Sequence, residues 1–328
     1  MQKPLGQNKT IELFTRLIST GKLGHAYLFE GEEGIGKKTL ANYICALMMC
    51  ESGNVCLRCN ACSCVSLGSH PDIIKISNGD KQTIGIDKIR ELAGKVYEKP
   101  VMAKYKAIII ENAHLLTKEA QNAMLKLIEE PPRYAVFMLL CNSTSKILKT
   151  VMSRVTKINI LPLDTAMLKS ICPDAPEFMY KYCRGNAGEL LRLKDDLEFA
   201  NLRNTTLKLI DTMLSKDEYA VYDAVSFTMT DRQQFLNQTD VLVSFFRDCI
   251  MKSIANDAMI TNLDFTQMLE KFCTYCGKTK THKYTRLVDA TLNAQKELIR
   301  NGNITMLKHI MLMKYWEVIN DNSNRCPL

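Results

Sequence analysis

Two hydrophobic patterns divide the chain. Over roughly the first 160 residues, short apolar runs typical of buried strands alternate with segments of helical periodicity. The apolar runs are Ala26–Phe29, Ile73–Ile76, Ala107–Ile110 and Ala135–Leu140, followed by a strand-like stretch at Lys157–Ile160. The clearest helices are Ile86–Tyr97 and Thr117–Glu130, and Thr39–Met49 is also helical in pattern. Such alternation predicts an α/β fold with a mainly parallel sheet covered on both faces.

The later part of the chain lacks the residues that interrupt regular structure. No proline lies between Pro176 and Pro327, and only Gly277 and Gly302 follow Gly188. Apolar residues recur every three or four positions from Val241 to Ile254 and again from Ile304 to Tyr315. This spacing predicts packed amphipathic helices.

Composition narrows the class of protein without identifying it. A chain of 328 residues, 46% hydrophobic and 24% charged, is typical of a globular protein with two or three domains. No stretch approaches the roughly 20 apolar residues of a membrane span, and the polar N-terminus is unlike a signal peptide, so we expect a cytoplasmic protein without membrane contact. The net charge of +8 fits contact with nucleic acid or an acidic partner, and equally a merely basic surface.

Five of the thirteen cysteines lie between Cys50 and Cys64. Cys50, Cys56, Cys59 and Cys62 have the spacing C-x5-C-x2-C-x2-C, and four thiolates so spaced favour tetrahedral Zn²⁺. A site with four protein ligands has no position for reactive water, so the predicted zinc is structural. Cys64 is a less favoured alternative to Cys62 because it breaks the C-x2-C spacing. His70 is the other conceivable ligand, but Pro71 after it indicates a turn before the strand at Ile73.

A second cysteine pair, Cys273-x2-Cys276, stands without another pair, and only His282 is near it in sequence. We interpret these cysteines as two thiols of a helical region.

A phosphate-binding loop follows the first predicted strand. Gly31, Gly34, Gly36 and Lys37 give the spacing GxxxxGK between a strand and a helix. Glycines let backbone N–H groups face an anion, the helix N-terminus adds positive potential, and Lys37 is placed to reach terminal phosphates.

Two positions depart from an active nucleotide hydrolase. The residue after Lys37 is normally Ser or Thr, whose hydroxyl binds Mg²⁺, but here it is Lys38, and Thr39 comes one position late. The strand Ala107–Ile110 ends in Glu111-Asn112 where an active enzyme resembles Asp-Glu, and an amide cannot act as a general base. We therefore predict no ATP hydrolysis by the chain alone, while nucleotide binding without hydrolysis stays open.

Arg154 lies just before the strand-like stretch Lys157–Ile160. Its position is compatible with a surface ion pair and with an arginine finger, which stabilises the charge of phosphoryl transfer.

Together these motifs resemble the delta-prime family of bacterial DNA polymerase III clamp-loader subunits, which are AAA+ proteins. The stretches that carry the resemblance are Gly6-Gln7, His25–Phe29, the four-cysteine insert, His70-Pro71-Asp72, Ala120–Lys126 with Glu129-Glu130-Pro131, and Ser153-Arg154, with a weak match at Asn301–Asn303. The block from Asn122 to Pro131 is highly specific to clamp-loader subunits, and the resemblance covers most of the chain.

The resemblance implies three domains. They are a RecA-like AAA+ core over residues 1–162 with a zinc module at 50–64, a small helical lid over 163–206, and an all-helical collar over 207–328 that joins subunits into a ring. It also implies a non-hydrolysing stator whose Arg154 acts in trans on a neighbouring ATP site. The implied partners are the gamma/tau motor and delta subunits and, through the assembled complex, the sliding clamp and primer–template DNA.

The sequence departs from the family pattern in places. Val155 replaces the cysteine of the family's Ser-Arg-Cys motif, and Glu189 lies near the place where motor subunits carry a cis-acting arginine. The competing hypothesis is an active gamma/tau-type motor ATPase, which Lys38 and Asn112 disfavour. A third hypothesis, a zinc-dependent DNA-binding module, lacks a basic or aromatic helix beside the cysteines.

Overall fold

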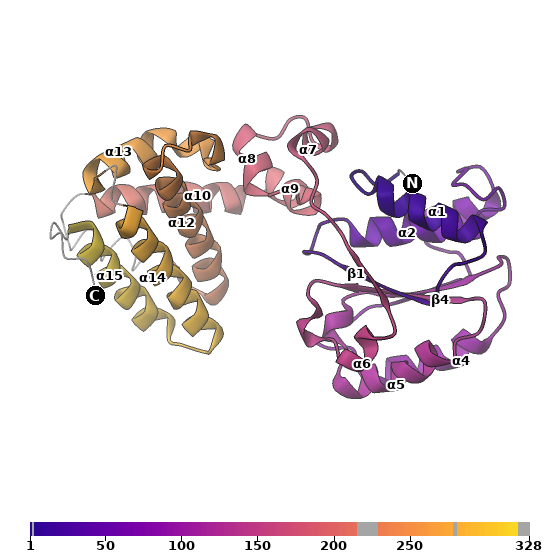
Figure 1. Cartoon of the computed structure of the whole chain (residues 1–328). Helices are drawn as coiled ribbons and strands as arrows, with labels where there is room; N and C mark the ends of the chain where they lie inside the picture. The colour runs from indigo at the N-terminus through magenta and orange to yellow at the C-terminus, as the bar shows by residue number, and fades with distance from the viewer. Residues whose placement is uncertain (2, 215–228, 278–280, 321–328) are drawn as a thin grey trace. The chain divides into compact units, whose positions relative to one another are not determined.

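The computed structural model describes residues 1, 3–214, 229–277 and 281–320 (Figure 1). Contacts divide the chain into two compact units. The first comprises Met1–Asp174 and Cys183–Leu191, and the second comprises Ala175–Tyr182 and Arg192–Leu328. The predicted collar includes residues 215–228, 278–280 and 321–328, which lie outside the described residues, and the boundaries at 163 and 207 stay predictions.

The first unit is built on a parallel sheet of five strands in the order β2-β3-β4-β1-β5. The strands are β1 (Ala26–Glu30), β2 (Ile73–Ile76), β3 (Lys106–Ile110), β4 (Ala135–Cys141) and β5 (Thr156–Asn159). Every residue of β3 and β4 is buried. Because parallel strands begin at one edge and end at the other, the residues that follow β1, β3 and β4 gather at one edge of the sheet.

Helices cover both faces of this sheet (Figure 1). The helices with residues in the first unit are α1 (Asn8–Ser19), α2 (Lys37–Met49), α3 (Asn60–Leu67), α4 (Ile86–Tyr97), α5 (Lys118–Glu129), α6 (Lys149–Met152), α7 (Thr165–Ile171) and the start of α9 (Ala187–Lys194), with short 3-10 turns η1 (Ala113–Leu115) and η2 (Thr144–Lys146). Alternate residues of each strand face α1 and α2 on one side and α4 and α5 on the other; Ile109 lies in the first layer and Ile108 in the second. The predicted two-faced parallel sheet is confirmed.

The predicted elements agree closely with the observed ones. The bounds of β2 and α4 are those that periodicity predicts. Helix α5 begins one residue later than predicted because Thr117 is its N-cap, whose Oγ1 accepts a hydrogen bond from the Ala120 N–H at 3.2 Å. Helix α2 begins at Lys37, two residues earlier than its apolar pattern indicates, because it starts directly from the left-handed Gly36.

The second unit is helical over its described residues, as the sequence predicts. Its elements are α8 (Glu177–Tyr182), the end of α9, α10 (Leu197–Met213), α12 (Arg232–Ser253), η3 (Asp257–Met259), η4 (Leu263–Phe265), α13 (Thr266–Cys276), α14 (Thr281–Ile299) and α15 (Ile304–Asn320). Phe245 and Phe246 of α12 pack edge-on against Phe272 and Tyr315, respectively. No helix in the described ranges has the length and apolar character needed to cross a membrane.

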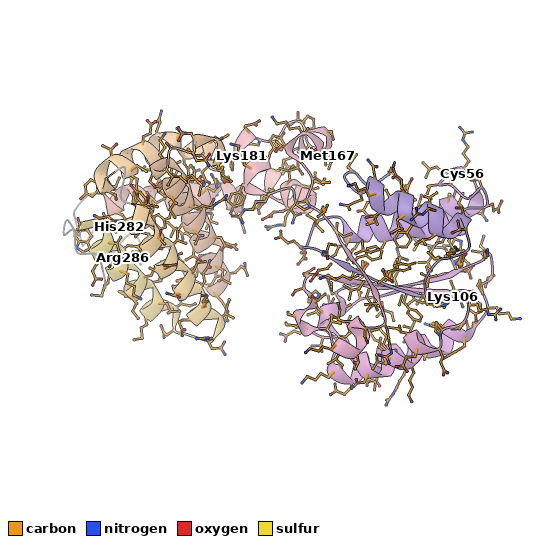
Figure 2. The ribbon with its side chains drawn as sticks, viewed as in Figure 1. Cys56, Lys106, Met167, Lys181, His282 and Arg286 are labelled. Atoms are coloured by element: carbon orange, nitrogen blue, oxygen red, sulfur yellow. The ribbon has the colours of Figure 1, made fainter. Side chains whose placement is uncertain are left out.

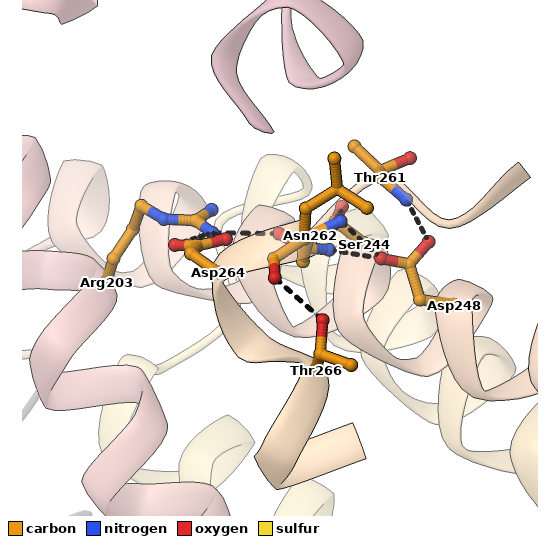
Figure 3. A network of polar contacts seen from close by, with 8 residues as sticks. Arg203, Ser244, Asp248, Thr261, Asn262, Asp264 and Thr266 are labelled. Carbon is orange, nitrogen blue, oxygen red and sulfur yellow. Dashed lines mark hydrogen bonds and ion pairs between the residues drawn. The ribbon is translucent and has the colours of Figure 1, made fainter. Parts of the chain in front are cut away.

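A buried polar network joins α10 and α12 to the turn before α13 (Figure 3). The Asp248 carboxylate accepts the backbone N–H groups of Thr261 and Asn262 at 3.0 and 2.7 Å. Arg203 donates to Asn262 and Asp264, and its guanidinium lies 4.2 Å from the ring centre of Phe178 and 4.1 Å from that of Phe265. The paired charges and flanking rings offset the cost of burying the arginine.

Two buried charged side chains hold the connections of the first unit in place. Lys106, labelled in Figure 2, donates to the carbonyl oxygens of Lys95 and Glu98 at the end of α4. The Asp72 carboxylate is fully buried and accepts the N–H groups of Val101, Met102 and Ala103 at 2.6 to 2.9 Å. Burial alone would raise the pKa of Asp72, but these three donors outweigh it and hold the pKa below its usual value.

We expect Asp72→Asn to destabilise the first unit by about 2–4 kcal/mol, because a neutral amide cannot accept three donors as a carboxylate does. The lowered pKa means that the carboxylate stabilises the fold above the unfolded-state value of about 4, and that this contribution is lost as the pH falls through the folded-state pKa. The difference between wild type and variant should therefore shrink in acid. Urea unfolding, with amide hydrogen exchange of residues 99–105 as a local readout, measures both effects.

The matched control is Asp80→Asn, because Asp80 is exposed on the same unit. Equal unfolding midpoints and equal exchange rates for the Asp72 and Asp80 variants would contradict the role of Asp72.

Candidate functional site

The glycine loop connects β1 to α2 at the edge of the sheet where the strands end. Gly34 and Gly36 have φ angles of +82° and +105°, a region that other residues rarely adopt. At Gly31 an added Cβ would lie 2.9 Å from the Ile35 side chain. The three glycines are therefore required by the conformation of this loop.

Lys37 is directed back into the loop. Its ammonium donates to the carbonyl oxygens of Gly31 and Glu32 at 2.6 and 2.7 Å and to Oδ1 of Asn142 at 2.9 Å. The residue is only 8% exposed, and burial lowers the pKa of its ammonium. An ammonium group has three donors, so all of them are bonded within the protein.

Asn142 is a site residue that the sequence analysis did not identify. It follows β4 directly and ties the end of that strand to Lys37. A polar residue placed directly after a fully buried strand was the available signal.

Two of the three residues that depart from an active hydrolase, Lys38 and Glu111, contact each other at the edge of the sheet. Lys38 Nζ lies 2.7 Å from Oε2 of Glu111, and their side chains are 62% and 18% exposed. Thr39, which the sequence analysis considered a misplaced hydroxyl, is exposed on α2. The lysine therefore takes the carboxylate at the end of β3 as its partner.

Asn112 also has a partner. Its φ angle is +52°, and its Nδ2 donates to Oδ1 of Asn78 at 3.0 Å. An amide held in this way has no proton-accepting group of suitable basicity for activating water.

The first turn of α9 and the residue before it pack directly on the glycine loop. Asn186 Nδ2 donates to the Glu33 carbonyl at 2.6 Å, and the Gly188 N–H donates to the Gly34 carbonyl at 3.0 Å. A Cβ on Gly188 would lie 2.6 Å from the Gly34 Cα, so only glycine fits there. With the bonds made by Lys37, four successive loop carbonyls, from Gly31 to Gly34, have donors from within the first unit.

Arg154 lies between α6 and β5 and is 40% exposed. Its Nε lies 2.7 Å from Oε1 of Glu129, and one terminal nitrogen donates to the Thr150 carbonyl at 3.0 Å and to the Ser153 hydroxyl at 3.1 Å. These contacts orient the guanidinium while leaving part of it accessible. Glu129, the last residue of α5, is a partner that the sequence analysis did not assign.

The four cysteines of the predicted metal site lie together between the end of α2 and the start of α3; Figure 2 labels Cys56. The Cys50 sulfur lies 3.5 Å from that of Cys56 and 3.9 Å from that of Cys59, and the sulfurs of Cys56 and Cys62 are 3.9 Å apart. A tetrahedron with metal–sulfur bonds of about 2.3 Å has edges of about 3.8 Å. The four thiols therefore fit around one ion.

Local backbone geometry favours the thiolate form of Cys56, whereas burial raises the pKa of Cys62 to about 12. The N–H of Cys59 donates to the Cys56 sulfur and that of Cys62 to the Cys59 sulfur, each at 3.4 Å. The N–H groups of Arg58 and Cys59 lower the pKa of Cys56 to about 6. A metal requires deprotonated thiols, so the lowered pKa of Cys56 suits metal binding.

The alternative ligands lie outside the cluster. Cys64 contacts Asn60, and His70 is buried with its Nδ1 accepting the Asp72 N–H. Cys273 and Cys276 are buried in α13, and burial raises the pKa of Cys276 to about 12. Within the residues that the structure describes, Cys50, Cys56, Cys59 and Cys62 are the one group of this kind able to hold a metal ion.

The sheet order, the loop after β1, and the Glu111 carboxylate after β3 define a phosphate-loop protein of the AAA+ class. Comparison with known sequences is more specific. The family described as "DNA polymerase III, delta subunit" matches residues 6–164. The DNA polymerase III subunit delta' of Bacillus subtilis is 25% identical over 94% of this chain and 95% of its own length.

Gamma-type subunits are also similar. The DNA polymerase III subunit gamma of Buchnera aphidicola is 30% identical over 65% of this chain, which spans 62% of that relative. The gamma/tau subunit of Mycoplasma pneumoniae is 36% identical over 46% of this chain, which spans 22% of that longer protein. The chain is therefore similar to delta-, delta'- and gamma-type subunits of DNA polymerase III.

A solved structure of a gamma subunit-related protein from Thermotoga maritima aligns over 94% of this chain and 99% of its own, with 19% identity and a TM-score of 0.48.

The thiol cluster predicts about one bound metal ion per chain. Cys59→Ser should lower the metal content and the local stability, because Cys59 supplies both a ligand and the acceptor for the Cys62 N–H. Elemental analysis of protein purified without chelator, and amide exchange of residues 50–67, measure the two effects.

Cys64→Ser is the matched control, since Cys64 lies in the same segment outside the cluster. Two results would contradict the predicted metal site: wild-type protein that contains no metal, or an equal loss of metal in the Cys59 and Cys64 variants.

Proposed function

We propose that this chain is a non-hydrolysing stator subunit of a bacterial DNA polymerase III clamp loader. The observation that carries the proposal is the Lys38–Glu111 ion pair, together with the amide at Asn112. An active loop needs a hydroxyl at the position of Lys38 and a free metal-binding carboxylate at the position of Glu111. Here the two side chains neutralise each other's charge. The similarity to delta' of B. subtilis over nearly the full length of both chains supports the same assignment.

In this role the chain assembles with gamma/tau-type motor subunits and a delta subunit in the cytoplasm. It contributes to loading a sliding clamp on primer–template DNA through the assembled complex. The three-domain arrangement, with an AAA+ core to residue 162, a lid to 206 and a collar beyond, is part of this proposal. The metal of the cysteine cluster is structural Zn²⁺, which four thiolates at tetrahedral spacing favour.

The second candidate is an active gamma/tau-type motor. The intact GxxxxGK spacing and the gamma relatives at 30–36% identity favour it. Lys38 and Asn112 disfavour it, because a motor needs both the magnesium-binding hydroxyl and a base for water.

ATP turnover by the purified chain separates these two candidates. We expect no turnover above background, because the metal-binding and water-activating groups are replaced. Lys37→Ala serves as the control, since it removes the lysine that any active loop requires. Robust turnover that disappears in this variant would assign the chain to the motor class.

The stator proposal also gives Arg154 a role in trans. An arginine finger contributes on the order of a thousandfold or more at the site it serves. In a complex reconstituted with motor and delta subunits, Arg154→Ala should lose part of the total ATPase and a larger part of clamp loading, because only one motor site receives this arginine. Assembly should survive, because the helical second unit and not this exposed side chain would hold the ring.

Arg154→Lys should rescue little, because lysine keeps the charge but lacks the planar guanidinium. Arg90→Ala is the matched control, since Arg90 is an exposed arginine of the same unit paired with Asp87. If both Arg154 variants load clamps at the wild-type rate, Arg154 is only a surface charge and has no role in trans.

A further inference from the structure

The phosphate-loop class implies a magnesium ion beside the loop. The side chains of this chain at that place either do or do not supply the ligands that the ion requires. Magnesium in such a loop takes a hydroxyl from the residue after the lysine and is held by a carboxylate at the end of another strand of the sheet. Only the carboxylate exists here, as Glu111. Its Oε2 is already 2.7 Å from the Lys38 ammonium. The residues present therefore do not fit the metal.

Charge makes the misfit stronger than the missing hydroxyl alone. Magnesium requires oxygen ligands at about 2.1 Å in a near-octahedral arrangement. An ammonium bonded to one of those oxygens places a unit positive charge within a few ångströms of the incoming divalent ion. At about 4 Å this charge repels the ion, so a divalent ion can bind Glu111 only if the ammonium is displaced from it.

The positions of the two partners show how the contact is built. Lys38 is the second residue of α2, so its side chain leaves the first turn of the helix that follows the glycine loop. Glu111 is fixed by its own N–H, which donates to the Ile76 carbonyl at 2.8 Å, and its side chain is 18% exposed. The carboxylate of this anchored residue and the exposed end of Lys38 therefore meet at the edge where the strands end.

We propose that the Lys38 ammonium is a tethered cation that replaces the divalent metal of the phosphate loop. It occupies the Glu111 carboxylate and excludes divalent ions from the site. The inference deepens the proposed non-hydrolysing role and rests on it, but it concerns metal binding by the isolated chain. Its outcome is therefore separate from assembly, from ATP turnover and from the role of Arg154.

The test measures Mn²⁺ binding by electron paramagnetic resonance on the full-length, zinc-loaded protein. Manganese prefers the oxygen ligands that suit magnesium, whereas the thiolate cluster prefers zinc. Lys38→Thr removes the charge and supplies the hydroxyl, so it should gain one Mn²⁺ site bound at least about tenfold more tightly than any site of the wild type at this loop. Lys38→Ala removes only the charge and should gain less.

Two further proteins locate the gained site. Glu111→Gln added to Lys38→Thr should abolish the gain, because the amide is a poor ligand for the ion. Lys118→Thr is the matched control, since Lys118 is an exposed lysine in the first turn of α5 and its loss should change nothing.

Three results would overturn the proposal. The first is Mn²⁺ binding by Lys38→Thr no tighter than by wild type. The second is a gain that persists in the double variant, which would place the ion away from Glu111. The third is a wild-type site that Glu111→Gln alone abolishes, since Lys38 would then not exclude the metal. Thermal unfolding of each variant confirms that the compared proteins are folded.

Discussion

The ammonium group of Lys37 is the contact on which the geometry of the loop region depends. It joins two loop carbonyls to Asn142 at the end of β4, so one side chain fixes the loop relative to the sheet. A buried ammonium is stable only when its donors are bonded, and here each donor has an oxygen. The same charge that makes this lysine suitable for phosphate thus organises the loop itself.

The other charged residues of the site follow the same principle. Lys38 takes Glu111, and Arg154 takes Glu129. These pairs are partly exposed, so each contributes little to stability by itself. Their effect is to decide which charges stay accessible: the Glu111 carboxylate is occupied, whereas the guanidinium of Arg154 is oriented by one edge and remains partly exposed. The glycine loop therefore has the spacing of a nucleotide hydrolase, but the charged groups beside it are paired differently from those of an active enzyme.

The thiol cluster differs from this charged region because it is built from sulfur ligands that lie close together in the sequence. Two C-x2-C turns direct backbone N–H groups at sulfur, and the cluster is completed by Cys50 at the end of α2. An ion held there would cross-link the end of that helix to the following segment. Because α2 begins at Lys37, the same helix carries the phosphate-loop lysine at one end and a thiol ligand next to the other.

The sequence by itself determined the local structure and the residue types of the site. The bounds of α4 and β2 follow from periodicity, and the four-cysteine spacing identified thiols that the fold does bring together, because both signals lie within a few turns of the chain. The partners of the charged residues were not predictable in this way. Asn142 lies 105 positions from Lys37 and Asn186 lies 153 positions from Glu33, and no local pattern relates such residues. Only the packing of parallel strands, which brings the ends of β1, β3 and β4 to one edge, decided that Lys38 meets Glu111 and that Lys37 meets Asn142.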